Sequence, residues 1–336
     1  MIFFITCLRA LAACLITNAH YTGIYPIDLI ANGGLIGDVL FFAVSGYCLY
    51  NVKTSFPKWY GKRIYRVYPP VLIMTAIYVV LGFYSLNEHS AGWWFIYPTY
   101  YHFVASIIVL YIPFYFIIKI RFLRERILSV MGTIAIVWLL LYFTVYDKSY
   151  YHIDTVREPM IRFLFMECML LGAWFRQNDE KVRNKFKVWH PIATVIVFCV
   201  YFESKILFSH RESLASFQIL NQLSIFALLI LIFLTFAGLD SKLENLPVWI
   251  KKVISFVSGI TLEIYVVQYV LIELIRSVGI FPLNWILLTA SILGSAFILH
   301  KLTEGFYHGI EYISSKSWGG GVKIEPTYNR SMAVGI

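Results

Sequence analysis

Two ionisable residues lie in or beside the first apolar stretch of this 336-residue chain. Residues 2–19 are apolar enough to enter a bilayer, yet they contain Arg9, and His20 follows directly. The eleven-residue spacing equals three helical turns plus about 20°, so both side chains lie on one helix face, about 16 Å apart along the axis. Burying a charge in a membrane span costs about 2.5–3.5 kcal/mol, so Arg9 must face protein, water or a ligand.

This pair has a chemical and a structural interpretation. A histidine can transfer protons, and an arginine can stabilise a carbonyl oxygen or an anion. Alternatively, Arg9 pairs with a carboxylate on another span and His20 lies at the membrane interface. Ionisable residues inside a membrane are functional by default, yet this pair alone leaves the chemical and the structural interpretation equally open.

A second candidate pair, Arg63 and Arg66, lies in the segment WYGKRIYRVYPP (residues 59–70). In a helix, residues three apart share a face, so the two guanidinium groups would point the same way. Two such groups suit phosphates, which arginine binds through two parallel hydrogen bonds. Anchoring of the membrane topology and contact with lipid headgroups are the alternatives.

Four further polar residues are candidates for supporting roles. Asp38 and Ser45 belong to the segment GGLIGDVLFFAVSGY (residues 33–47), whose glycines and serine favour close helix packing. Asp38 could pair with Arg9, with His20 or with a substrate. Glu167 lies in a short apolar run and Glu304 near the end of the last one, while Glu263 and Gln268 are polar islands that suit interhelical hydrogen bonds or a pocket.

Composition identifies the environment in which these residues must work. The chain is 59% hydrophobic, 18% aromatic and only 14% charged, which no soluble globular domain resembles. Apolar runs close to the ~20 residues that a spanning helix needs predict an all-α integral membrane protein with about ten transmembrane helices. The predicted spans are residues 2–19, 35–52, 68–86, 101–118, 127–146, 161–176, 191–209, 215–238, 253–275 and 281–301.

The net charge of +9 follows the membrane topology and does not indicate a nucleic-acid partner. Of the 28 Lys and Arg residues, 21 fall in alternate loops and the tail, and 5 fall on the other side; Arg9 and Arg162 are inside spans. Basic residues accumulate on the cytoplasmic side, so both termini are predicted to be cytoplasmic. The predicted organisation is a polytopic domain over residues 1–313 and a flexible cytoplasmic tail over residues 314–336.

The remaining motifs exclude several classes of function. The first apolar run begins at once and shows no clear cleavage site, so it is predicted to be a retained span. The five cysteines lie in apolar runs with no metal-type spacing, and no P-loop, HExxH or GxGxxG pattern occurs. We therefore expect no metal site and no permanently bound cofactor.

The ordered set of motifs resembles the membrane-bound acyltransferase-3 family. That family has an Arg followed at a distance by His in the first span, a Gly-rich turn into Phe-Phe-x-x-Ser-Gly-aromatic, and Arg-x-x-Arg before a tyrosine and proline. The matching residues are Arg9 and His20, then Gly37 to Tyr47, then Arg63, Arg66, Tyr68 and Pro69. Thr303-Glu304 resembles the family's closing Glu-x-Pro without its proline, and Gln268 stands where histidine is common.

The resemblance implies an O-acyltransferase of the cell (inner or plasma) membrane. Such an enzyme moves an acyl group, usually acetyl, from acetyl-CoA to a hydroxyl of a surface or lipid-linked glycan. Arg63 and Arg66 would then bind the acyl-CoA phosphates, and His20 and Arg9 would be catalytic. A transporter or flippase for a lipid-linked sugar or another solute is the alternative, because polar residues within spans suit that function too.

Overall fold

A computed structural model describes residues 2–95, 101–156, 158–183 and 186–317, apart from the side chains of residues 311 and 313–317. Within these ranges the chain is helical and contains no strand. The α-helices are α1 (Phe3–Ala19), α2 (Gly34–Leu49), α3 (Phe56–Val80), α4 (Ala91–Phe95), α5 (His102–Lys119), α6 (Arg121–Glu125), α7 (Ile127–Thr144), α8 (Ile161–Gln177), α9 (Asp179–Arg183), α10 (Trp189–His210), α11 (Ile219–Gly238), α12 (Asp240–Glu244), α13 (Val248–Gly259), α14 (Thr261–Arg276) and α15 (Leu283–Ser317).

Six segments of the described chain are long and apolar enough to cross a membrane, and α13 with α14, bent by 72°, would make a seventh. The protein is therefore a multi-pass membrane protein, whereas the predicted count of ten spans is not confirmed. Two helices at predicted spans, α1 and α8, have only 17 residues each. The cytoplasmic position of both termini stays a prediction.

Several helix boundaries differ from the sequence-based ones. The third helix begins at Phe56, so Arg63 and Arg66 lie inside it and not in the preceding loop. The last helix continues through Ser317, into the first residues of the predicted tail. Residues 318–336, the rest of that tail, lie outside the described residues.

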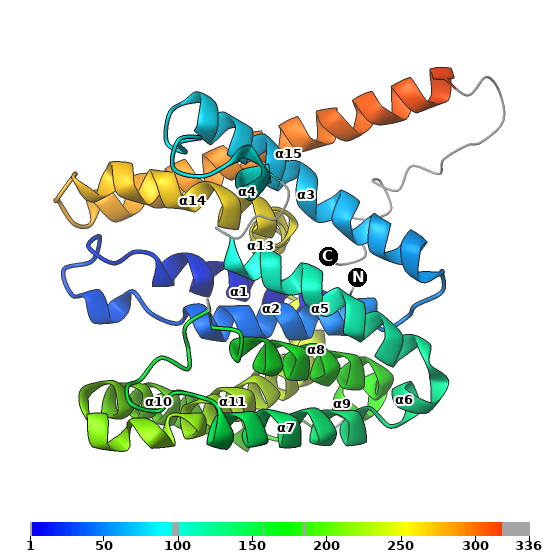
Figure 1. Cartoon of the computed structure of the whole chain (residues 1–336), viewed down its shortest axis with the longest axis vertical. Coiled ribbons are helices and arrows are strands. Elements are labelled where there is room, and N and C mark those ends of the chain that lie inside the picture. Colours follow the sequence, from blue (N-terminus) through cyan, green and yellow to red (C-terminus); the bar gives the residue numbers. More distant parts are fainter. Residues whose placement is uncertain (1, 96–100, 157, 184–185, 318–336) are drawn as a thin grey trace.

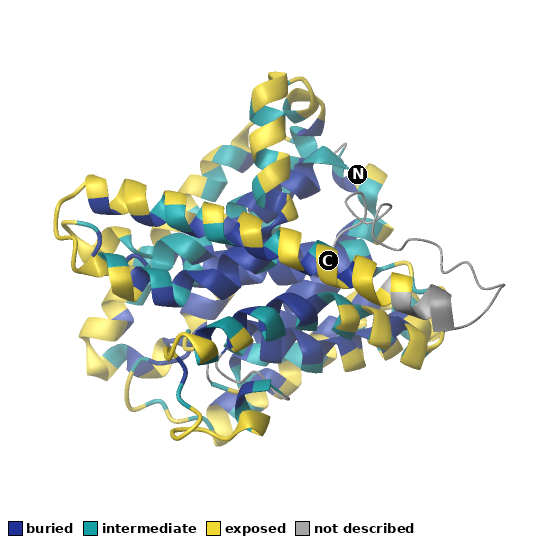
Figure 2. Ribbon diagram, turned by 90° about the horizontal axis from the view of Figure 1, so that it is seen from above, coloured by how far each residue is buried: buried dark blue, intermediate teal, exposed yellow. Residues whose placement is uncertain are grey.

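The helices form three tiers, with α1 and α2 in the middle (Figure 1). Above them lie α3, α14 and α15, and below them α7, α8, α10 and α11. Burial follows this arrangement, because the central helices are dark and the peripheral ones carry exposed stripes (Figure 2). Only 22% of the apolar stretch of α7 and 11% of that of α10 are buried inside the protein, as expected for helices whose outer faces contact lipid.

Glycines allow α2 to approach its two neighbours closely. A Cβ at Gly37 would lie 2.7 Å from the carbonyl oxygen of Ala12 on α1. On the α8 side, a Cβ at Gly46 would overlap the Met169 carbonyl, and one at Gly172 would overlap the Ala43 carbonyl. Small residues at membrane helix interfaces permit such backbone contact, and here they fix the position of α1 against α8 through α2.

A carboxylate from a distant part of the chain holds the first turn of α1. The backbone N–H of Phe4 donates to Asp240 at 2.8 Å, which satisfies one of the free N–H groups of a helix start. Arg183 also donates to Asp240, at 2.6 Å. Because α1 carries Arg9 and ends directly before His20, this contact helps to set the axial position of both candidates.

Candidate active site

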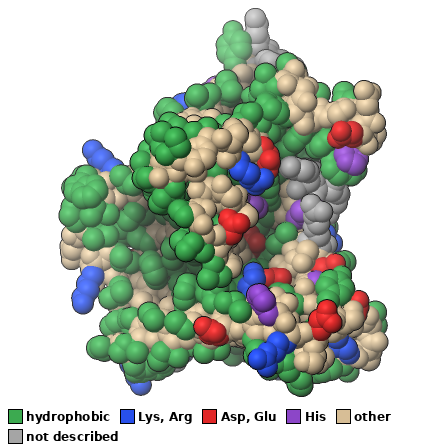
Figure 3. Space-filling model, turned by 90° about the vertical axis from the view of Figure 1, so that its left-hand side faces the viewer, with side chains coloured by type: hydrophobic (Ala, Val, Ile, Leu, Met, Phe, Trp, Pro, Cys, Tyr) green, Lys and Arg blue, Asp and Glu red, His purple; other side chains and the backbone are tan. Residues whose placement is uncertain are grey.

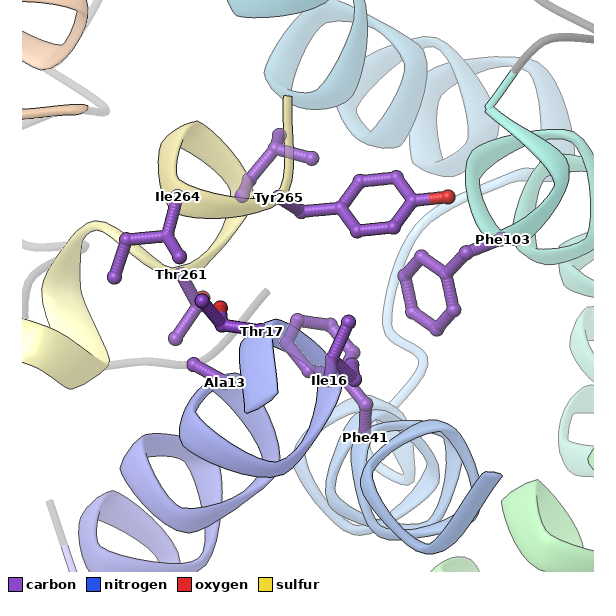
Figure 4. Close-up of a pocket in the computed structure, with 9 residues that line it drawn as sticks. Ala13, Ile16, Thr17, Phe41, Phe103, Thr261, Ile264 and Tyr265 are labelled. Atoms are coloured by element: carbon purple, nitrogen blue, oxygen red, sulfur yellow. The ribbon is translucent and has the colours of Figure 1, made fainter. Parts of the chain in front are cut away.

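One face of α1 connects the two candidate catalytic residues through a small pocket (Figure 4). Ala13, Ile16 and Thr17 follow Arg9 by four, seven and eight residues, so they lie on the face that ends at His20. All three line the pocket, together with Phe41, Phe103, Thr261, Leu262, Ile264 and Tyr265. The pocket therefore lies along α1 between Arg9 and His20.

The walls of this pocket are mostly apolar. The ring of Tyr265 extends toward Phe103, and their centroids are 5.7 Å apart (Figure 4). Thr17 is the exception on α1, because its Oγ1 atom is buried without a hydrogen-bond partner in the described structure. A buried hydroxyl without a partner costs stability, and a ligand that bonded to it would remove that cost.

His20 lies one residue beyond the end of α1, at the far end of this face. It is half-buried, and its ring lies 5.1 Å from that of Tyr269 on α14, in an edge-to-face arrangement. Burial lowers the pKa of the His20 imidazole below its usual value of 6.5. The neutral form therefore predominates at pH 7, and this form can accept a proton.

Arg9 lies at the other end, and the structure brings it together with the second candidate pair. It is 5% exposed, and its Nε is buried without a hydrogen-bond partner among the described residues. Arg9 is within electrostatic range of Arg66, and Arg66 is within range of Arg63. Three arginines from α1 and α3 thus share one region, near Cys48 at the end of α2.

The sides of this arginine cluster are aromatic. The Arg63 guanidinium lies over the Trp59 ring, 5.5 Å from its centroid, which favours a cation. Tyr111 of α5 lies within electrostatic range of Arg63 and Arg66, and its hydroxyl is buried without a hydrogen-bond partner. The Nε of Arg63 is also buried and unpaired. The cluster therefore keeps several donors that a bound anion could occupy.

A carboxylate–histidine group adjoins the cluster, and its histidine was not foreseen from the sequence. His300 Nδ1 lies 2.8 Å from Glu263 of α14, and its Nε2 lies 3.5 Å from Glu304. Glu304 also pairs with Lys301 at 2.6 Å. Glu263 is within electrostatic range of Arg9. The four-residue spacing of His300 and Glu304 was a signal, whereas contact with Glu263 depends on how α14 packs on α15.

The other supporting candidates are Asp38, Ser45 and Glu167. Asp38 forms no hydrogen bond or ion pair with any described residue, so it pairs with neither Arg9 nor His20; Tyr201 and Tyr265 are within its electrostatic range. The hydroxyl of Ser45 and Oε1 of Glu167 are buried without partners. Within the described chain Arg9 has no carboxylate at ion-pair distance, although Glu263 is within its electrostatic range.

The fold and this site define a class: a multi-pass membrane protein with ionisable residues gathered between its helices. A family model described as an acyltransferase domain, that of the acyltransferase-3 family, matches residues 2–301. The chain therefore belongs to the acyltransferase-3 family, as its motifs indicated, and is a membrane acyltransferase. No curated protein and no solved structure matches the chain.

Proposed function

We propose that this protein is an O-acyltransferase of the cell membrane that moves an acetyl group from acetyl-CoA to a hydroxyl of a surface or lipid-linked glycan. One observation carries the proposal. A face of α1 leads from a cluster of three arginines, through a pocket, to a half-buried histidine. An extended donor with phosphates at one end and a thioester at the other fits this order of groups.

The arginine cluster supports the donor end of the proposal. Arg66 repels both Arg9 and Arg63, and Glu263 is the one carboxylate among the electrostatic neighbours of Arg9. Like charges held together are stabilised when an anion binds between them. The phosphates of acyl-CoA would supply that charge, and arginine binds phosphate through paired hydrogen bonds.

His20 is the proposed base at the acceptor end. Its neutral imidazole takes the proton of the glycan hydroxyl as that oxygen attacks the thioester carbonyl, and the CoA thiolate leaves. In a second route, His20 first accepts the acyl group as an acyl-imidazole and then passes it to the hydroxyl. About 16 Å of helix axis separates Arg9 from His20, so we assign Arg9 to orienting the donor.

The test measures the O-acetyl content of the surface polysaccharide by proton NMR. The cells lack the gene and are restored with wild type, His20→Ala or His210→Ala. A positioned base contributes about 10²–10⁴ in rate, so His20→Ala should remove the acetyl signal at an unchanged protein level. His210, exposed at the end of α10, is the control and should restore the signal. Retained acetylation in His20→Ala would refute the catalytic assignment.

A second arm tests the donor. Arg63→Ala with Arg66→Ala should weaken acetyl-CoA binding to the purified protein. Arg121→Ala with Arg124→Ala is the matched control, because it removes two arginines of the same spacing from the exposed helix α6. Equal binding by both double variants would leave Arg63 and Arg66 as topology anchors. An unchanged acetyl signal with altered polysaccharide amount in the gene-deleted cells would favour a transporter or flippase.

A further inference from the structure

Two adjacent prolines interrupt the hydrogen bonding of α3 directly beside the arginine pair. Pro69 and Pro70 lie inside this helix, and proline has no backbone N–H. In an α-helix the N–H of each residue donates to the carbonyl four residues earlier. The carbonyls of Tyr65 and Arg66 therefore lose their helical donors, in the same turn that carries Arg63 and Arg66.

A side chain from the other end of the sequence supplies a hydrogen-bond donor to these carbonyls. The hydroxyl of Tyr307 on α15 donates to the carbonyl of Tyr65 at 2.9 Å and approaches that of Arg66 at 3.4 Å. Tyr307 is 8% exposed, and its ring lies 4.9 Å from that of Tyr65. A phenol buried in this way is held by packing as well as by its hydrogen bond.

The same face of α15 carries His300 and Glu304, seven and three residues before Tyr307. His300 holds Glu263, which lies within electrostatic range of Arg9 and Tyr307. One face of α15 thus contacts α14 at Glu263, the carboxylate near Arg9, and α3 at the backbone of Arg66. This arrangement links the position of α15 to the geometry of the cluster.

We infer that Tyr307 is a positioning residue for donor binding. Its hydroxyl bonds to the Tyr65 and Arg66 carbonyls, which have no helical N–H donor because residues 69 and 70 are prolines. This contact holds the turn of α3 that presents Arg63 and Arg66. The inference rests on the proposed role of the two arginines as the acyl-CoA site. Tyr307 itself need not touch the donor. Its effect passes through the backbone of α3 to the directions of the two guanidinium groups.

The test compares the binding of acetyl-CoA and of acetyl-pantetheine, which lacks the nucleotide phosphates, to the purified full-length protein. Tyr307→Phe removes only the hydroxyl, and a lost hydrogen bond of ordinary strength should raise the Kd for acetyl-CoA about fivefold. Acetyl-pantetheine binding should change by less than about twofold, because it has no phosphates for the arginines. Equal weakening of the binding of both ligands would indicate a general loss of structure and would contradict the inference.

Tyr142→Phe is the matched control, because it removes a phenol-to-carbonyl hydrogen bond of 2.7 Å, to Ser216, far along the chain from α3 and α15. It should lower thermal stability to a similar degree and leave acetyl-CoA binding unchanged. An equal loss of acetyl-CoA binding in both variants would overturn the inference.

Repeating Tyr307→Phe in a protein that lacks the two prolines tests whether the hydroxyl acts through these carbonyls. Pro69→Ala with Pro70→Ala restores two backbone N–H groups, so the carbonyls of Tyr65 and Arg66 regain helical donors. In that background Tyr307→Phe should change the Kd for acetyl-CoA by less than about twofold. An effect of the same size in both backgrounds would show that the hydroxyl acts elsewhere. Wild-type protein that fails to bind acetyl-CoA would refute the proposed donor itself. This outcome differs from failure of the Tyr307 inference, in which the wild type binds acetyl-CoA but Tyr307→Phe has no specific effect.

Discussion

Glu263 shows how one buried carboxylate is stabilised at the residue scale. It is 7% exposed, and the imidazole of His300 lies 2.8 Å away. A buried charge without a hydrogen-bonding partner is costly, so the histidine compensates for the position of Glu263 within α14. Glu304 and Lys301 extend the same chain of contacts toward the surface of α15.

A double-mutant cycle at this pair measures that compensation. His300→Ala should destabilise the protein by about 1.5–3 kcal/mol, because it leaves Glu263 buried without its partner. Glu263→Gln removes the charge, so the double variant should be more stable than the sum of the two single effects implies. Thermal unfolding of purified protein in detergent reports all four stabilities. Strict additivity would show that the two side chains do not interact.

At the residue scale, the sequence already placed Arg9 and His20 on one face and Arg63 beside Arg66. Those relations depend only on helical periodicity, which short spacings specify. The donor to Glu263 and the hydroxyl that reaches Arg66 were not predicted, because they lie 37 and 241 residues away. No local pattern encodes a contact of that separation.

The contact of α2 with α8 dominates at the element scale. Gly46 and Gly172 each meet a backbone carbonyl of the other helix, so neither position has room for a side chain. A larger residue must separate the helices, and α1 rests on the opposite side of α2 through Gly37. Disturbing α2 should therefore be transmitted to the face that carries Arg9 and His20.

Glycine-to-alanine substitutions with opposite expected effects on stability test this packing. Gly46→Ala or Gly172→Ala should destabilise the protein by about 1–3 kcal/mol through overpacking. Gly132→Ala on α7 and Gly294→Ala on α15 are controls, because no described atom beyond the local helix backbone lies within 4 Å of their added Cβ. In a helix interior the controls should be neutral or stabilising by up to about 1 kcal/mol. Equal melting temperatures for all four variants in detergent would contradict the close packing.

Orientation in the membrane is the question at the scale of the whole molecule. The end at which α1 finishes and α2 begins presents acidic, basic and histidine side chains among hydrophobic ones (Figure 3). The excess of Lys and Arg in alternate loops predicts that this end is the outer one. His20 would then meet the glycan on the outside, and the arginine cluster would meet acyl-CoA in the cytoplasm.

Cysteine labelling checks this orientation with two isosteric substitutions in a cysteine-free protein. Ser149→Cys lies in the segment after α7 and Ser241→Cys lies in helix α12, and both serines are exposed. A membrane-impermeant maleimide should modify position 149 in intact cells and position 241 only after permeabilisation. The reverse pattern would invert the topology and place His20 in the cytoplasm.

Composition, periodicity and motif order were enough to predict an all-α membrane protein of the acyltransferase-3 family and a shared face for Arg9 and His20. These properties are local, since hydropathy decides which segments enter a bilayer and 3.6 residues per turn decides which side chains share a face. Only the tertiary structure brought Arg9 to Arg66, left Asp38 without a pairing to Arg9 or His20, and set His300 and Tyr307 against their partners. Such contacts depend on how helices pack, and close approach at a few glycines decides that packing across the whole bundle.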